Sequence, residues 1–347
     1  MSAEFLSIMI RKIRIYFLVN FLKIGYDRYI YQTKEPVPML QFPKNYFQDE
    51  TVDGFHIEAM MKCAWAAQLE VLEALRELCE EYQITYFADW GTLLGAVRHQ
   101  GFIPWDDDVD ICMLRPDYER FLSIANRELP ETFHVHSEYS SDLYEMPFAR
   151  MVNATTISYS AERLQRFHGC PYVVGLDIFP LDVLPEDKEA EELQCKLFTT
   201  LLANVKKARN HLDEVTARLP ELEKMCGLHF DRSKDIKNQL LRAVTTVSCL
   251  YNNTTAPFMT HLTYHVGRRR YLRREWYRKT VWLPFEGIKI PAPVDYREAL
   301  TALFDANYMI PNCQPGHEYP FYQKQYNMLV EALVAGRMAD SVTPDLF

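Results

Sequence analysis

Apolar residues recur at helical spacing between positions 56 and 82. They lie mostly three or four residues apart, at Met60, Met61, Ala64, Trp65, Leu69, Leu72, Leu75, Leu78 and Cys79. This period predicts an amphipathic helix that buries one face in a core. The next residues, 84–88 (ITYFA), are mostly β-branched or aromatic, so we expect the helix to lead into a short strand.

Strand-like and helix-like segments alternate in the residues that follow. Helices are expected at 92–99 and 116–129, and strands at 109–114, 133–139, 147–159 and 172–179. Residues 186–280 carry mainly helical periodicity. They include the basic run GRRRYLRREWYRKT at 267–280, which predicts a solvated helix because its arginines spread around most of a helical wheel. The pattern favours an α/β (α+β) fold with a mixed sheet and a helical subregion at about 186–280.

The N-terminal residues differ in character from the rest. Residues 5–26 are strongly apolar, but basic residues interrupt them at Arg11, Lys12, Arg14 and Lys23. Such a segment is too interrupted for a membrane span and does not resemble a signal peptide. It is either a basic helix lying on an anionic membrane or a helix packed on the domain that follows. With a proline-containing linker at 32–48, we divide the chain into an N-terminal segment, 1–50, and a main domain, 51–347.

A run of aspartates stands at the start of the strand expected at 109–114. In an extended chain alternate side chains share a face, so Asp106, Asp108 and Asp110 would point one way and Asp107 the other. At a spacing of roughly 7 Å and an effective dielectric of about 20, each neighbouring pair of charges repels by roughly 2 kcal/mol. A bound cation would remove this repulsion.

The flanks of the run argue against a solvated acidic loop, which is the ordinary explanation of such a charge run. Apolar Phe102, Ile103 and Trp105 precede it, and the apolar strand VDICML follows at 109–114. Carboxylates at the root of a buried strand are costly unless they are paired or bound to metal. Hard oxygen ligands suit Mg²⁺ or Mn²⁺, so the sequence predicts a site for one of these ions.

The residues before the run predict a phosphate site. Glycines at 91 and 95 permit close backbone approach, and the N-terminus of the helix expected at 92–99 presents free N–H groups to an anion. Gly91 and Thr92 are therefore candidates for binding a donor phosphate. Arg98 is a third candidate, because its planar guanidinium can bind a phosphate through two hydrogen bonds. A salt bridge with Asp106 or Asp107 would explain an arginine at this position nearly as well. His99 is expected to be a structural histidine.

The order of strand, glycine turn, helix and Asp-x-Asp strand resembles the core of the nucleotidyltransferase fold. The string GTLLGAVRHQGFIPWDDDVDI, followed by RPDYERF, is similar to the signature of the LicD family. The best-known members of that family are implicated in transferring phosphocholine from CDP-choline to cell-surface glycans. GLDIFPLDVLP at 175–185 and FEGIKIPAPVDYREAL at 285–300 fit the same pattern, and the resemblance covers about residues 65–325. It departs at 304–309, where FDANYM stands in place of the usual Tyr-Gly-Asp-Tyr string.

The resemblance implies a third carboxylate on a strand beside the Asp-x-Asp strand. Asp177 is our first choice because an unpaired charge inside the apolar strand at 172–179 would be expensive. Asp182 is the alternative, although a turn role explains it equally well. His317 resembles the family's terminal histidine and would lie at the edge of the site, or is an exposed loop residue. The predicted catalytic set is Asp106, Asp108, Asp110 and Asp177, of which the last three hold the metal.

The net charge and the cysteine pattern indicate which class of partner is unsuitable and in which cellular compartment the protein is expected. The net charge of −9 makes nucleic acid an unsuitable partner. The eight cysteines show no CxxC pair, so we expect reduced thiols, with a zinc site around His168 and Cys170 as a minor alternative. We therefore expect a cytoplasmic protein, peripheral on the cytoplasmic membrane face if residues 5–26 bind lipid.

The expected function is metal-dependent transfer of a substituted phosphate from a CDP-activated alcohol to a hydroxyl of a cell-surface glycan or a lipid-linked oligosaccharide. CDP-choline is the leading donor, and Trp90, Trp105 and Tyr118 are the aromatics nearest the motif for a cage around its quaternary ammonium. One alternative is a nucleotidyltransferase acting on a small molecule or sugar, which would release pyrophosphate from a nucleoside triphosphate. A second alternative is an inactive glycan-assembly scaffold.

Overall fold

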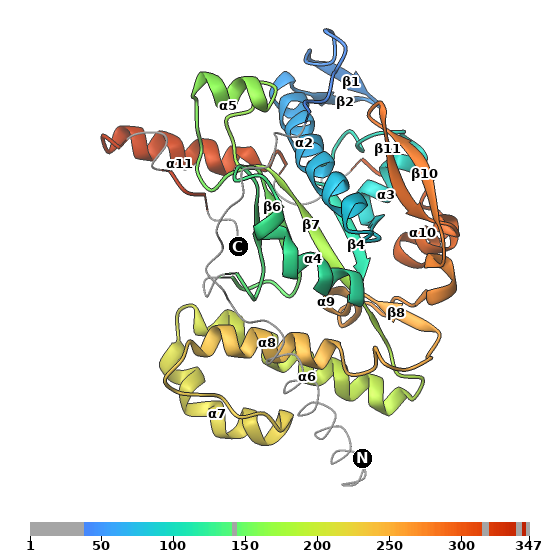
Figure 1. Cartoon of the computed structure of the whole chain (residues 1–347), viewed down its shortest axis with the longest axis vertical. Helices are drawn as coiled ribbons and strands as arrows, with labels where there is room; N and C mark the ends of the chain where they lie inside the picture. The colour runs from blue at the N-terminus through green and yellow to red at the C-terminus, as the bar shows by residue number, and fades with distance from the viewer. Residues whose placement is uncertain (1–37, 141–143, 314–318, 338–341, 345–347) are drawn as a thin grey trace.

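The computed structural model describes residues 38–140, 144–313, 319–337 and 342–344, and its centre is a mixed sheet (Figure 1). The strand order is β3 (Phe87–Ala88), β4 (Asp110–Leu114), β7 (Gly175–Val183), β6 (Ala149–Val152) and β5 (His134–His136). The β4–β7 pair is parallel, and the other pairs are antiparallel. At the far end of β7 the sheet continues through β8 (Phe258–Thr260) to β9 (Leu272–Arg273). The predicted mixed α/β architecture is confirmed.

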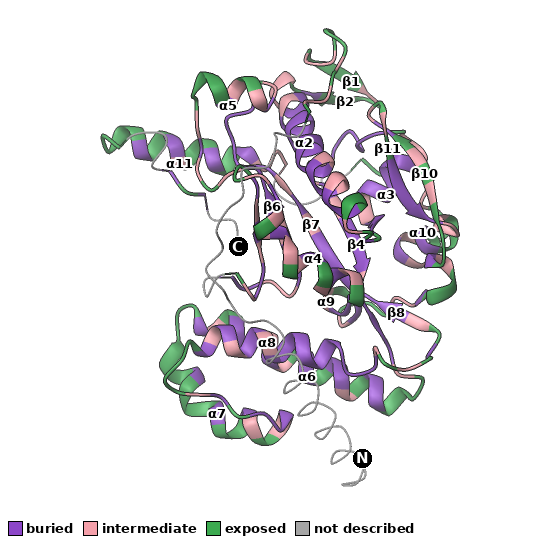
Figure 2. Cartoon of the chain, in the orientation of Figure 1, coloured by how far each residue is buried: buried purple, intermediate pink, exposed green. Residues whose placement is uncertain are grey.

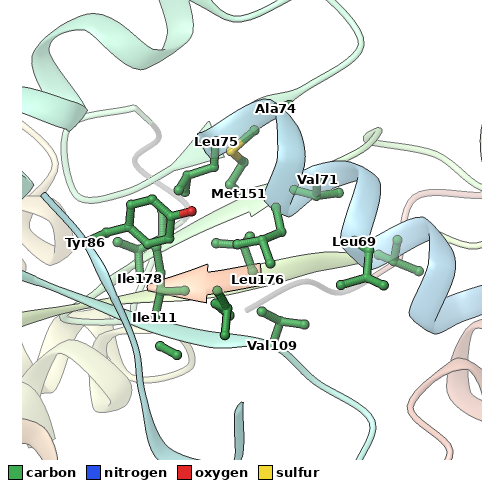
Figure 3. Close-up of a cluster of buried hydrophobic side chains, with 14 of the residues drawn as sticks. Leu69, Val71, Ala74, Leu75, Tyr86, Val109, Ile111, Met151, Leu176 and Ile178 are labelled. Atoms are coloured by element: carbon green, nitrogen blue, oxygen red, sulfur yellow. The ribbon is translucent and has the colours of Figure 1, made fainter. Parts of the chain in front are cut away.

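The helix predicted from the first apolar pattern is α2 (Ala59–Glu81), and it packs on one face of this sheet (Figure 3). Its Leu69, Val71 and Leu75 are fully buried with residues of β4, β6 and β7. Helix α4 (Arg115–Glu128) contacts the same sheet and α2. Because side chains alternate along a strand, Leu176 and Ile178 of β7 join this core, while Asp177 and Phe179 face the opposite side.

A second hydrophobic core joins that opposite side of the sheet to the helical subregion. It contains α6 (Lys188–Ala208), α7 (Leu212–Cys226) and α8 (Ile236–Ser248), which lie together at the bottom of Figure 1. The long helices end at Ser248, earlier than the predicted boundary at about 280. Figure 2 shows the buried residues of α6 and α8 on the faces that pack inward.

The solvated helix predicted at 267–280 is wrong. The segment contains β9 and a short 3₁₀ helix, η1 (Arg274–Tyr277), after the one-turn helix α9 (Leu262–His265). Pairing of β9 with β8 and burial of Leu272 and Tyr277 fix this shape. The favourable helix propensity of arginine is small and is overridden by these tertiary contacts.

The remaining elements lie around the sheet. They are the hairpin of β1 (Glu50–Val52) and β2 (Phe55–Ile57), the helices α3 (Trp90–Arg98) and α5 (Ala161–Arg166), the hairpin of β10 (Thr280–Phe285) and β11 (Ile288–Pro293), and the helices α10 (Tyr296–Phe304) and α11 (Tyr322–Val334). None of the helices in the described ranges is both long and apolar enough to cross a membrane. The predicted membrane contact of residues 5–26 lies outside the described residues and stays a prediction.

Candidate active site

A cavity of about 1100 Å³ lies on the side of the sheet that faces away from α2. The carboxylates predicted from the sequence as catalytic all line it: Asp106, Asp108, Asp110 and Asp177. Asp107 is buried, and its carboxylate accepts a hydrogen bond from the amide of Phe321 at 2.6 Å. The alternation expected along the aspartate run holds only in part, because residues 106–109 form a loop that becomes a strand only at Asp110. Asp107 does not line this cavity, but one of its oxygens lies within 4.8 Å of oxygens of Asp106 and Asp108.

Helix α2 holds the backbone of this acidic loop. Trp65 Nε1 donates to the carbonyl oxygen of Asp106 at 3.2 Å, and Gln68 Nε2 donates to that of Asp107 at 2.8 Å. Residues three apart in a helix lie on one face, so one stripe of α2 fixes two successive peptide groups. Sequence analysis assigned this stripe to the core alone and missed its polar role.

The cavity side of the sheet carries a row of charged residues across three adjacent strands. Asp110 of β4 lies beside Asp177 of β7, and Asp177 lies beside Arg150 of β6. The Arg150 guanidinium binds Asp177 through both oxygens, at 2.6 Å from Nε and 2.8 Å from Nη2. Sequence analysis missed Arg150. The signal was present, because this arginine is the single charged residue in the apolar segment PFARMVN and needed a partner for the same reason as Asp177.

The carboxylates raise one another's affinity for protons. Burial, followed by the charges of Asp108 and Asp177, raises the pKa of Asp110 well above its ordinary value. Burial and the neighbouring Asp108 likewise raise the pKa of Asp106. A site that resists the full negative charge of its own side chains is one that a divalent cation would stabilise.

Helix α3 supplies the wall next to the carboxylates. Asp89 caps it by accepting from the Trp90 amide at 3.0 Å, so the helix begins two residues earlier than predicted. A side chain at position 91 would place its Cβ 2.2 Å from Asp106 Oδ2, which explains the glycine there. Thr92 is a correction: it is buried, and its hydroxyl accepts from the Asp110 amide at 2.8 Å. It positions a carboxylate rather than binding a phosphate.

Arg98 lines the cavity, as the phosphate-binding prediction requires. Its Nη1 donates to the carbonyl oxygen of Tyr308 at 2.9 Å, in place of the salt bridge with Asp106 or Asp107 considered from the sequence. Tyr308 belongs to the loop that departs from the family pattern, so this loop still contributes to the cavity wall. His99 approaches Asp53 at 3.4 Å and packs edge-on against Trp105, which is the structural role expected of it.

Asp182 is a second correction. It lies five residues beyond Asp177, on the opposite face of β7, where it is buried. Arg115 binds both of its oxygens, at 2.8 and 2.6 Å, and Asn252 donates to one of them at 2.7 Å. This side chain joins α4 to the sheet, away from the cavity. His317 lies outside the described residues, and the edge role predicted for it stays a prediction.

Replacing Asp182 with asparagine should destabilise the fold by about 3 kcal/mol, because the buried Arg115 charge loses its bidentate partner. Chemical denaturation measures this loss. Asp213→Asn, on the exposed first turn of α7, is the control and should change stability by less than about 0.5 kcal/mol. Transfer activity per folded molecule should not change in either variant. If the Asp182→Asn protein is stable but inactive, Asp182 has a role in the active site, and its assignment as a structural residue is wrong.

The zinc site considered around His168 and Cys170 gains no support from the described residues. His168 Nε2 lies 2.6 Å from Glu70 Oε1, and the same buried Glu70 pairs with Arg166. Cys170 is buried, and its surroundings in the described chain supply no group of three ligand side chains. The contact with Glu70 therefore gives His168 a structural role.

Aromatic rings form part of the cavity wall. The ring of Tyr264 lies 5.0 Å from that of Trp90 and 5.7 Å from that of Phe179, measured between centroids, and Phe304 packs edge-on against Trp90. All four rings line the cavity, as does Trp105. Tyr118, the third aromatic suggested from the sequence, is instead fully buried in the core beside Arg115.

Comparison with known proteins agrees with this geometry. Residues 83–168 match the domain described as "LicD/FKTN/FKRP, nucleotidyltransferase domain". Over 242 residues the chain is 28% identical to the lipopolysaccharide cholinephosphotransferase LicD of Haemophilus influenzae, covering 68% of this chain and 86% of that protein. The chain is therefore similar to LicD-family proteins, most clearly over residues 83–168.

Shorter matches link this chain to two uncharacterised proteins. One, from Rickettsia prowazekii, is 34% identical over 94 residues, which is 22% of this chain and 35% of that protein. The other, from Rickettsia typhi, is 46% identical over 55 residues, 16% of this chain and 18% of that protein. The domain match at 83–168 includes the aspartate run and Arg150, whereas Asp177 lies beyond it.

Proposed function

We propose that this protein, which is similar to LicD-family proteins, transfers phosphocholine, or another alcohol phosphate, from a CDP-activated donor to a hydroxyl of a glycan. The main observation behind this proposal is that the carboxylate cluster and a group of aromatic side chains line the same cavity. The lipopolysaccharide cholinephosphotransferase with 28% identity supports the choline head group and a lipopolysaccharide-type acceptor. A volume of about 1100 Å³ accommodates a ligand at the upper end of the drug-sized range.

The carboxylates fit a magnesium or manganese ion. One oxygen each of Asp106, Asp107 and Asp108 lies within 4.8 Å of the others, so the acidic loop already gathers oxygen ligands. We prefer Asp108 and Asp110, with Asp177, as the ligands, because these three line the first cavity and Asp107 does not. The ion would neutralise charge on the donor diphosphate and on the leaving nucleoside monophosphate.

The remaining groups bind and orient the substrates. Arg98 and the start of α3 at Gly91 face the space where the donor phosphates would lie. Arg150 holds Asp177 and brings a second guanidinium to the reacting phosphate. Asp106 and Asp177 are the candidate bases for the attacking hydroxyl. The transfer needs no covalent enzyme intermediate, since positioning and charge stabilisation supply most of the rate.

The aromatic wall is the candidate pocket for the donor head group. A quaternary ammonium over aromatic faces gains about 0.5–2 kcal/mol, and more when it is desolvated. Trp90, Phe179 and Tyr264 present such faces beside the carboxylates. A neutral polyol head group would gain little from them, which favours choline over ribitol or glycerol.

Calorimetry with CDP-choline, CDP-ribitol, CDP-glycerol and free CDP in Mg²⁺ tests this proposal. CDP-choline should bind most tightly. Tyr264→Leu, which keeps bulk and removes the ring, should weaken CDP-choline binding by about tenfold while leaving CDP-glycerol binding nearly unchanged. Equal affinity of the wild type for all four ligands would mean that the wall selects no head group.

The domain name leaves nucleotidyl transfer as the second candidate. The two reactions differ in their products. Transfer of a substituted phosphate releases CMP from the CDP-linked donor, whereas nucleotidyl transfer releases pyrophosphate from a nucleoside triphosphate. Chromatography of the nucleotide products after incubation with each donor decides between them.

A further inference from the structure

A second cavity, of about 790 Å³, meets the first one at the charged row. Asp108, Arg150 and Asp177 line both cavities. The floor of the second cavity is apolar and is made by Val152 and by residues 173–176. Two separate spaces therefore open onto the same three charged side chains.

The outer wall of the second cavity is one stripe of α11. Lys324, Asn327, Met328 and Glu331 line it, and this spacing of three, four and seven residues places them on one face of the helix. Lys324, Asn327 and Glu331 are exposed. The α11 side of the second cavity thus carries the ammonium of Lys324, the amide of Asn327 and the carboxylate of Glu331, and the opposite side is the apolar floor.

Contacts at its N-terminal end fix the orientation of this helix. The Asp107 carboxylate accepts from the Phe321 amide at 2.6 Å. Gln325 pairs with the backbone of Val173, accepting from its amide at 2.9 Å and donating to its carbonyl oxygen at 2.7 Å. The aspartate run therefore supplies both the cavity carboxylates and the anchor of α11.

In-line displacement at phosphorus places the attacking and leaving oxygens on opposite sides of the transferred group. The first cavity has the aromatic wall, Arg98 and the start of α3 that suit a nucleotide diphosphate donor. The second has hydrogen-bonding groups facing an apolar floor, which matches a saccharide with its hydroxyls and its apolar ring faces.

We propose that the second cavity is the acceptor site and binds a saccharide, with the attacking hydroxyl directed at the charged row. This inference rests on the function proposed above. The new bond joins the acceptor oxygen to phosphorus, and the bond from phosphorus to the CMP oxygen breaks, so CMP leaves with the electron pair. The hydroxyl proton is released to solvent water.

Two matched tryptophan substitutions on α11 test the proposal in the full chain. Asn327→Trp fills the second cavity, whereas Leu333→Trp places the same ring on the exposed opposite side of the helix. Saturation-transfer NMR with delipidated lipopolysaccharide oligosaccharide should show binding to the wild type and to Leu333→Trp, and at least about tenfold weaker binding to Asn327→Trp. The KM for this acceptor should rise by a similar factor.

Donor measurements separate this proposal from the proposed function. CDP-choline affinity, measured by calorimetry in Mg²⁺, should be the same in all three proteins, because the donor lies in the first cavity. If CDP-choline fails to bind or react, the proposed function fails, and saccharide binding still tests the second cavity. No saccharide binding to the wild type, or equal binding to the two tryptophan variants, overturns the acceptor site.

Discussion

Asp110→Asn should abolish transfer and, in the absence of metal, leave the protein at least as thermally stable as the wild type. Asparagine keeps the shape of the side chain but removes the charge that Asp108 and Asp177 repel. A proposed metal ligand is lost at the same time, so the rate should fall at least about a thousandfold. Steady-state assays and thermal denaturation measure the two effects.

The stability effect of this substitution should depend on pH. Burial and neighbouring carboxylates raise the pKa of Asp110, so the folded state binds a proton more tightly than the unfolded state does. The wild type should therefore lose stability as the pH rises from about 4 through the raised pKa. Asp110→Asn should lose less over the same window, and Mg²⁺ should stabilise only the wild type. Unfolding of Asp110→Asn at a clearly lower temperature, or retained transfer, would contradict a metal role.

Arg150→Met should lower kcat by about two to three orders of magnitude. The methionine fills similar space but releases Asp177 and removes the guanidinium that both cavities share. Arg150→Lys keeps the positive charge but cannot form the bidentate ion pair with Asp177, so it should recover only part of the lost kcat. Because Arg150 faces the reacting group from both cavities, kcat should change more than the KM of either substrate.

Arg166→Met provides the matched control for Arg150. Arg166 pairs with buried Glu70 at 2.6 Å, and this pair lies outside both cavities. Its loss should lower the free energy of unfolding while kcat per folded molecule stays near the wild-type value. If Arg166→Met and Arg150→Met reduce kcat equally, the arginine of the charged row has only a structural role.

Much of the site could be predicted from local sequence patterns. Side-chain direction along an extended chain repeats every two residues, and this period correctly brought Asp106, Asp108 and Asp110 to one cavity. It did not separate Asp107 fully, because the loop at 106–109 keeps one of its oxygens within 4.8 Å of oxygens of Asp106 and Asp108. The same period applied along β7 would have placed Asp177 and Asp182, five residues apart, on opposite faces and so excluded Asp182. Similarly, the cost of burying a charge identified Asp177 and could have identified Arg150.

By itself, the sequence determined the long first helix, the Asp-x-Asp strand, the glycine at position 91 and the carboxylates of the cavity, because each depends on short-range periodicity or on the cost of burying a charge. The tertiary structure alone decided which partners these residues meet. Pairing of β6 with β7 brings Arg150 to Asp177, and the folding of α11 onto Asp107 joins residues 214 positions apart. Strand neighbours and helix docking depend on the packing of the whole chain, and no local pattern encodes them.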